Sequence, residues 1–313
     1  MKKYILRRFL HLIPILFGIT LLTFGLMRMM NDDAVDMMYE KNGAVSAEVM
    51  EAKRAELGLD KPFIVQYGTW LGGIVTGDMG KSYISGNPVF ESFSEKLPAT
   101  VELMVVSLLI TLCIAVPLGI IAAVTQDSMA DRTIRFLSFV GNSMPNFFVA
   151  LLLIYFLAVK LHLLPVMGNS ADWRSVILPA LTLTISMGAK YTRQIRAVVL
   201  EELEKPYVAG ARSRGVSEYR ILLFSVLKSS LITLVSLLAL SVGSLLGGTA
   251  IVETIFMWDG VGKMAVDAIL MRDYPLIQSY VVWMAFIYVM VNLTADILYH
   301  FLDPRVRLGR EDG

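Results

Sequence analysis

Six apolar stretches, each about as long as a lipid bilayer is thick, constrain the fold of this 313-residue chain. A helix needs about 20 apolar residues to cross the hydrocarbon layer. The stretches are Phe9–Met30, Leu103–Val124, Phe136–Val159, Val176–Ala197, Ser229–Val252 and Leu276–Tyr299. Hydrophobic residues make up 56% of the chain and its mean hydropathy is +0.63, more than a soluble core of this size can hide. The sequence predicts an all-α integral membrane protein with six transmembrane helices.

Charge predicts the orientation of these helices. Lys2, Lys3, Arg7 and Arg8 precede the first stretch, which is too long for a cleavable signal and has no small-residue cleavage site after it. The loop 31–96 carries eleven acidic against six basic residues, so the positive-inside rule places it outside the cytoplasm. Six crossings would return the C-terminal arginines to the cytoplasm, so we expect both termini there. Arg305, Arg307 and Arg310 are these arginines.

The predicted domain organisation follows. Residues 1–30 hold the N-terminal segment and first helix, 31–97 an extracytoplasmic insertion between the first and second helices, 98–305 a core with five helices, and 306–313 a cytoplasmic tail. Within the insertion, Ser46–Leu57 begins at a suitable N-cap and ends before Gly58, which predicts a short helix. Pro62–Val75 predicts a second one. Its interfacial anchors would be Tyr67, Trp70 and Leu71.

A polar segment, Pro206–Lys228, lies between the fourth and fifth apolar stretches. Eight basic against four acidic residues between Lys190 and Lys228 place it in the cytoplasm. A charged helix-turn-helix retained in an apolar protein favours docking of a cytoplasmic partner.

Three basic residues interrupt the fourth stretch, whose outer end is also broken by Leu178-Pro179. Lys190, Arg193 and Arg196 are three residues apart and share one face of a helix. Two interpretations stay open: side chains that reach the inner leaflet, or a basic stripe lining an inward-open cavity.

Several sites of known chemistry are not predicted. Gly77–Ser82 ends like a phosphate-binding loop, but Val75 stands where that motif needs its first glycine. His11, His162 and His300 have no acid or cysteine at metal-ligand spacing, so we predict no metal site and no catalytic residue, only packing at the membrane edge. A net charge of +1 gives no reason to expect nucleic-acid binding. The single cysteine, Cys113, is expected to be a small buried hydrophobe.

Polar and irregular positions inside the apolar stretches are candidates for a translocation pathway. Ser143-Met144-Pro145-Asn146 places a helix-breaking proline in the third stretch, where either a pathway or a plain kink fits. Met187 and Glu253 complete the candidate pathway.

Other positions in the apolar stretches concern helix packing. Asn292 and Asp296, one turn apart, favour helix packing or ion coupling, and the small residues Gly243 and Gly247 favour close helix contact. Five methionines cluster where the first stretch ends: Met27, Met29, Met30, Met37 and Met38. They favour adaptable packing over soft-metal binding, and a role in a substrate vestibule stays open.

Motifs spread along nearly the whole chain resemble the membrane permease subunits of ABC importers in the dipeptide, oligopeptide and nickel branch. The residues that carry the resemblance are Arg7-Arg8, Leu12-Ile13-Pro14, Phe24, Leu57–Pro62, Gln66-Tyr67, Gly77–Ser82, Pro88-Val89, Leu97–Thr100, Arg272–Gln278 and Asp303-Pro304-Arg305.

The resemblance assigns two further segments. Tyr207–Gly215 is similar to the family's coupling segment, which packs into a groove on the ATPase subunit, although Ala209 and Gly210 replace the usual acid and alanine. The expected coupling residues are Tyr207, Val208, Ala211, Arg212, Arg214, Gly215, Ser217 and Glu218. Glu253–Gly262 is similar to an outer re-entrant segment, with Asp259 where the family usually has proline. Its expected residues are Phe256, Trp258, Asp259, Gly260 and Gly262.

The resemblance implies a subunit of the bacterial inner membrane that works with a second permease, two ATPase subunits and an extracytoplasmic binding protein. ATP and magnesium would be bound by the ATPases, so the chain itself needs no cofactor and is not an enzyme. The segments Ser143–Phe147 and Leu164–Gly168 look most like nickel-type permeases, which favours nickel or a chelated metal as substrate, with di- and oligopeptides as the alternative. A rival class, a proton-coupled transporter using Asp296 or Glu253, usually shows inverted repeats, and none is visible.

Overall fold

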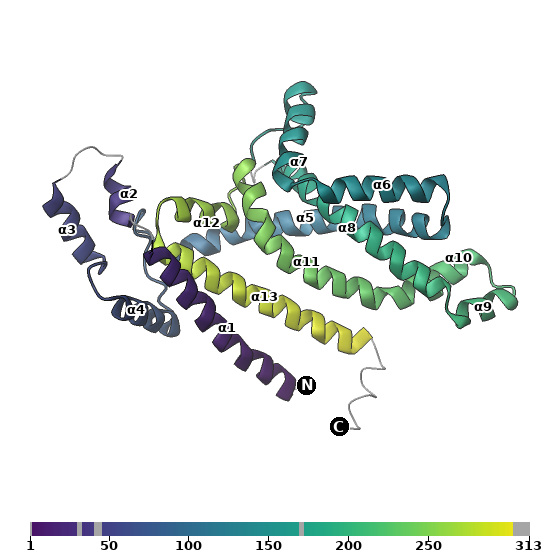
Figure 1. The fold of residues 1–313 in the computed structure, drawn as a ribbon, viewed down its shortest axis with the longest axis horizontal. Coiled ribbons are helices and arrows are strands. Elements are labelled where there is room, and N and C mark those ends of the chain that lie inside the picture. The colour runs from purple at the N-terminus through teal and green to yellow at the C-terminus, as the bar shows by residue number, and fades with distance from the viewer. Residues whose placement is uncertain (1, 30–32, 41–45, 169–171, 303–313) are drawn as a thin grey trace. The chain divides into compact units, whose positions relative to one another are not determined.

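The computed structural model describes residues 2–29, 33–40, 46–168 and 172–302. Across these ranges the chain is helical, and its one extended pairing is an isolated bridge between Lys81 and Pro88 (Figure 1). The chain divides into two compact units. The insertion unit comprises Met1–Thr100 with Asp259–Met290, and the core unit comprises Val101–Trp258 with Val291–Gly313.

The insertion unit contains α1 and three shorter helices, together with α12 and the ends of two helices shared with the core unit. Its own helices are α1 (Lys2–Arg28), α2 (Ala34–Glu40), α3 (Ala47–Glu56), α4 (Phe63–Thr76) and α12 (Val261–Leu270). The two helices predicted for the insertion are therefore confirmed. Ser46 is the N-cap of α3, without a side-chain hydrogen bond, and Gly58 beyond its end has a φ of +67°.

Tyr67 departs from the prediction of an interfacial anchor. It is 7% exposed and packs edge-on against Phe24 of α1, with ring centroids 5.3 Å apart. Its hydroxyl lies 3.0 Å from the Thr20 hydroxyl. Tyr67 was expected to lie at the membrane surface, but α1 covers the face of α4 that carries it.

The loop that resembles a phosphate-binding motif is instead fixed by a buried carboxylate. Ser82 donates its hydroxyl hydrogen to Asp273, and the Tyr83 amide donates to the same carboxyl group at 3.1 Å. Burial raises the pKa of Asp273, against the opposing effect of these hydrogen bonds. The loop is therefore anchored beside the start of α13 (Tyr274–Leu302).

The helix α5 (Val89–Val124), shared by the two units, is longer than expected. It is continuous through Leu97-Pro98, so the predicted boundary at residue 97 does not coincide with a helix end. At 1.5 Å per residue, its 36 residues span about 54 Å, well beyond one hydrocarbon layer.

The third apolar stretch is broken, as its proline predicted. The helix α6 (Met129–Ser143) ends before Met144, and α7 (Asn146–Leu153) continues into the π-helical turn η1 (Ile154–Lys160). The two parts meet at 104°. Pro145 is the N-cap of α7, a position where its missing N–H leaves no helical hydrogen bond unmade.

The remaining core helices are η2 (Trp173–Val176), α8 (Ile177–Leu203), α9 (Pro206–Ser213), α10 (Glu218–Arg220), η3 (Ile221–Val226) and α11 (Leu227–Ile255). Pro179 lies in the first turn of α8 and does not interrupt it, contrary to expectation. α8 packs closely on α5 because Gly119 faces Ile195, where a Cβ would come within 2.7 Å of the isoleucine side chain.

Two helices of the described structure are long and apolar enough to span a membrane, α5 and Tyr274–Thr294 of α13, and the bent pair would make a third. α8 carries the charged residues Lys190, Arg193 and Arg196 in its second half. The six-span topology therefore remains a prediction. The side chains of Asp296 and His300, and those of 244 and 246–248 in the α11 glycine pattern, lie outside the described residues.

Cys113 is exposed on α5, so its predicted burial is wrong for the chain by itself. The buried face of this part of α5 carries Ala115, Ala122 and Ala123, and Cys113 lies off that face. Among the methionines, Met27 packs with Ala268, Tyr274 and Ile277, whereas Met29 is 81% exposed.

Candidate functional site

The candidate coupling segment forms a short helix, a glycine turn and a second short helix. α9 begins at Pro206, whose fixed φ suits the first helical position, and ends at Ser213. Gly215 follows with a φ of +76°. Its amide donates to the Arg212 carbonyl at 2.9 Å, and the Val216 amide donates to the Ala211 carbonyl at 3.2 Å. This pair of bonds is a Schellman motif, which needs a left-handed residue at the position of Gly215.

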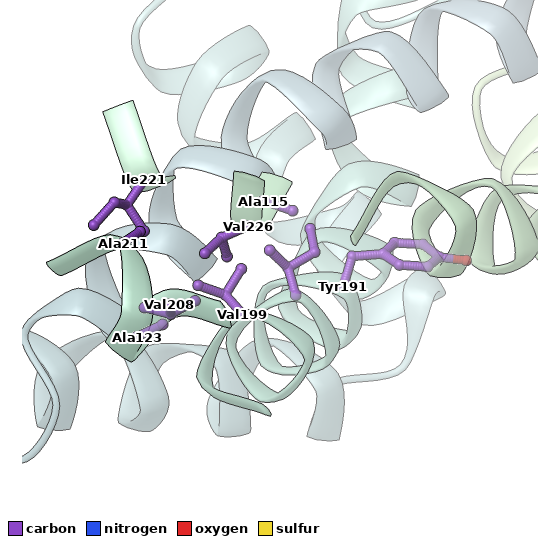
Figure 2. Close-up of a cluster of buried hydrophobic side chains, with 9 residues drawn as sticks. Ala115, Ala123, Tyr191, Val199, Val208, Ala211, Ile221 and Val226 are labelled. Carbon is purple, nitrogen blue, oxygen red and sulfur yellow. The ribbon is translucent and has the colours of Figure 1, made fainter. Parts of the chain in front are cut away.

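Two apolar residues of α9 anchor the segment to the core unit. Val208 is fully buried and Ala211 is 8% exposed. Figure 2 shows both in a cluster with Ala115 and Ala123 of α5, Tyr191 and Val199 of α8, and Ile221 and Val226 of η3; Ile195 also belongs to this cluster. Burying a valine contributes about 1.5 kcal/mol or more, so α9 is held against the ends of α5 and α8 by side-chain packing.

A polar contact fixes the start of α9. The Tyr207 hydroxyl donates to Glu202 Oε2 at 2.8 Å, and the Lys205 ammonium pairs with Glu202 Oε1. Burial, followed by the hydrogen bond to Glu202, raises the pKa of Tyr207. Glu202, on the last turn of α8, therefore links that helix to the coupling segment.

The outward side of the segment is exposed from Arg212 to Arg220. Arg212 forms a bidentate ion pair with Glu218, at 2.6 Å from Nε to Oε1 and 3.0 Å from Nη2 to Oε2. Hydrogen bonding to the Arg212 guanidinium lowers the pKa of Glu218. Arg214 and Ser217 flank Gly215 on the same exposed turn, and Ser217 is the N-cap of α10.

A hollow of about 640 Å³ lies beside this ion pair. Leu200 and Leu203 of α8, Leu222 of η3 and the exposed ring of Tyr219 contribute to its lining, together with Arg212 and Glu218. Apolar and charged side chains both line the hollow, which suits contact with another protein.

The predicted re-entrant segment is divided between the two units. On the core side, Phe256 and Trp258 are nearly fully buried, and the Gly168 amide donates to the Phe256 carbonyl at 2.6 Å. A Cβ on Gly168 would lie 2.7 Å from the Trp258 ring, so the glycine allows this contact. Met257 between them has a φ of +53°.

On the insertion side, Asp259 forms an ion pair with Lys96 at 2.5 Å. Gly260 is the N-cap of α12 and Gly262 is buried in its first turn. The Val261 amide donates to the Thr100 hydroxyl at 2.9 Å. The chain thus turns at this point without the proline that the family usually has.

The candidate pathway residues occupy different elements of the core unit. Ser143, Met144, Pro145 and Asn146 form the bend between α6 and α7, with Ser143 and Pro145 exposed. Met187 packs against the cluster that anchors α9, and Glu253 near the end of α11 is fully buried. A role for these residues in a pathway stays a prediction.

Asp131 is a buried charged residue that sequence reasoning missed. Its buried carboxylate pairs with Arg196, so the predicted basic stripe is divided: Arg196 is engaged, whereas Lys190 and Arg193 are exposed. Ser128, three residues earlier, accepts the Asp131 amide as an N-cap, and this Ser-x-x-Asp pattern was a readable signal for the start of α6.

Relatives of known sequence match the chain almost from end to end. It is 39% identical to the oligopeptide transport system permease protein AppB of Bacillus subtilis (strain 168), over 98% of this chain and 99% of that one. Identity is 35% to the dipeptide transport system permease protein DppB of Escherichia coli (strain K12) and 35% to a putative peptide transport system permease protein of Brucella abortus (strain 2308), both with the same coverage.

A solved structure supports the fold. A chain of the MetNI methionine ABC transporter in an inward-facing conformation matches with a TM-score of 0.60 at 15% identity, covering 68% of this chain and 97% of that one. Family models match residues 1–104, as the N-terminal part of such membrane components, and residues 115–308. The chain therefore belongs to the family of inner membrane components of binding-protein-dependent transport systems.

Proposed function

We propose that this chain is the permease subunit of an ATP-driven importer of di- or oligopeptides. The observation that carries the proposal is the end-to-end match to permeases named for peptide transport. The nickel prediction relied on two short segments, and one of them, Leu164–Gly168, has a packing role through Gly168. Peptides, the alternative in the sequence analysis, therefore become the main proposal.

The mechanism assigns a mechanical role to the coupling segment. An ATPase subunit would contact its exposed turn at Arg212–Glu218, while Val208 and Ala211 transmit the movement to α5 and α8. A second permease would complete the pathway, and an extracytoplasmic binding protein would deliver the peptide. Two ATPase subunits would bind ATP and magnesium. Six spans, with both termini in the cytoplasm, are part of this proposal.

The test is import into proteoliposomes that hold the chain with its co-purifying subunits and ATP. We expect the binding protein loaded with a dipeptide to stimulate ATP hydrolysis and peptide uptake, and a nickel chelate to stimulate neither. Stimulation by the nickel chelate alone would overturn the peptide proposal. Uptake that needs a proton gradient and no ATP would overturn the importer proposal.

A further inference from the structure

A cavity of about 340 Å³ in the insertion unit is separate from the coupling segment and has no assigned role. Residues of α1, the α3–α4 connection, α4, the loop 78–83 and the start of α13 line it. Its volume is at the lower end of the range for small-molecule sites, roughly 300–1,000 Å³. A compact ligand of a few chemical groups would fit.

Three basic and two acidic residues lie in the lining. Arg28 donates a hydrogen bond to Gln66 and lies over the rings of Phe24 and Tyr274, 5.2 and 4.5 Å from their centroids. In the part of the chain that the structure describes, none of the three basic residues that line the cavity forms an ion pair with a carboxylate. These residues are Arg28, Lys61 and Lys81.

The two acids in the same lining are already engaged. Glu56 pairs with Lys53 at 2.8 Å, and the carboxylate of Asp78 accepts the Gly80 amide at 2.8 Å. A guanidinium and two ammonium groups therefore lie around one cavity without an ion pair in the described residues, and the charge of Asp33 acts on Arg28 only from beyond ion-pair distance. A carboxylate is the ligand group that matches a guanidinium in both charge and geometry.

Trp70 gives an independent indication. It lines the cavity, and its indole N–H is buried without an acceptor within the described residues. A buried donor that makes no hydrogen bond destabilises the fold, so such groups normally have a partner. Because Trp70 lines the cavity, a small rotation of its side chain would bring this N–H to a ligand oxygen there.

We propose that this cavity binds the C-terminal carboxylate of a short peptide, an inference that rests on the proposed function. Arg28 and the two lysines would hold the carboxylate, and Trp70 would donate to it. The aromatic rings of Phe24, Tyr83 and Tyr274 give the adjoining wall an apolar character suited to a peptide side chain. The insertion would then hold a peptide before it enters the core.

The test is calorimetric titration of the full chain in lipid nanodiscs with alanyl-phenylalanine, its C-terminal amide and acetate. The amide keeps every other group but removes the negative charge, so we expect it to bind about tenfold more weakly or worse. Acetate, which keeps only the carboxylate, should also bind far more weakly than the peptide. Arg28→Gln should abolish measurable binding, and Trp70→Phe, which keeps the ring, should weaken it several-fold.

Arg174→Gln is the matched control, because it removes the same charge from an exposed residue in the other unit, and it should leave binding unchanged. Lys61→Gln, at an exposed position, tests the cavity without risk to folding. Equal binding of peptide and amide, or full binding by both Arg28→Gln and Trp70→Phe, would overturn the carboxylate site. Equal binding of acetate would overturn the peptide identity. ATP-driven peptide import with unaltered kinetics in these variants would overturn the site while leaving the proposed function intact.

Discussion

The Arg196 guanidinium on α8 forms a bidentate ion pair with the Asp131 carboxylate on α6, with distances of 2.7 Å from Nε to Oδ1 and 2.9 Å from Nη2 to Oδ2. The Asp131 side chain is fully buried and the Arg196 side chain is 18% exposed. Arg135 adds a longer contact to the same carboxylate at 3.3 Å. The pair ties the start of α6 to α8, the helix that leads into the coupling segment.

Arg196→Gln should destabilise the core unit by about 3 kcal/mol, because it leaves a buried carboxylate without its main partner. The apparent unfolding midpoint of the detergent-solubilised chain measures this change. Arg193→Gln, one turn earlier and exposed, is the control and should change the midpoint little. If both variants unfold at the same temperature, the ion pair does not stabilise the unit. Asp131→Asn combined with Arg196→Gln should recover part of the loss.

Gly215→Val should uncouple ATP hydrolysis from transport. A β-branched residue at a φ of +76° strains the turn by roughly 1–2 kcal/mol, which shifts the exposed residues that follow α9. Gly215→Asn, which tolerates the left-handed region, should keep most of the coupling. The measurement is the ratio of substrate-stimulated ATP hydrolysis to peptide uptake.

Gly210→Ala is the control for that experiment, because Gly210 lies inside α9 with open space where the new methyl group would be. It should leave coupling unchanged or strengthen the helix slightly. Normal coupling in Gly215→Val would contradict a mechanical role for this turn.

Arg212→Glu should lower coupling without lowering stability. The Arg212–Glu218 pair is exposed at the surface, so its contribution to folding is small. Its bidentate geometry nevertheless closes the turn that an ATPase would contact. The double variant Arg212→Glu with Glu218→Arg should restore part of the coupling, whereas the unfolding midpoints of all three chains should agree. Equal coupling in the single and double variants at a reduced level would show that the arginine itself, and not the pair, is needed.

Acid should loosen the contact between α2 and α3. Asp33 is partly buried, which favours its neutral form, but the Arg54 guanidinium and backbone amides outweigh this and hold its pKa below the ordinary value of an aspartate. A carboxyl group with a lowered pKa stabilises the fold above its unfolded pKa, and this stabilisation is lost as the pH falls through its folded pKa. Pepsin should therefore cut the insertion faster below about pH 3.8, relative to an unfolded reference at the same pH. Asp33→Asn should remove most of this change, and an unaltered pH profile would exclude Asp33 as its cause.

Much of the local structure could be predicted from local chemistry. The helix after Ser46, the break at Pro145 and the turn at Gly215 each depend on the conformational preference of one or two residues. The polar segment after α8 was predicted as a docking element because its charge contrasts with the apolar stretches around it, and that role stays a prediction.

Long-range partners could not be predicted in this way. Tyr67 is covered by α1, Arg196 finds Asp131 65 residues away, and Ser82 finds Asp273 191 residues away. A period of three residues along a helix defines a face but does not say what packs on it. For this reason the three basic residues of α8 were predicted to share one environment. The structure instead pairs Arg196 with the buried Asp131 and leaves Lys190 and Arg193 exposed.

The sequence by itself determined that this protein is helical, apolar and related to permeases, because these properties depend on composition, periodicity and short motifs. The tertiary structure decided which polar groups are paired. It paired Asp131 with Arg196, and within the described residues it left Arg28 without an ion pair and the Trp70 indole N–H without an acceptor. Pairing and burial depend on segments that meet only on folding, and these determine the electrostatic energy of each charge.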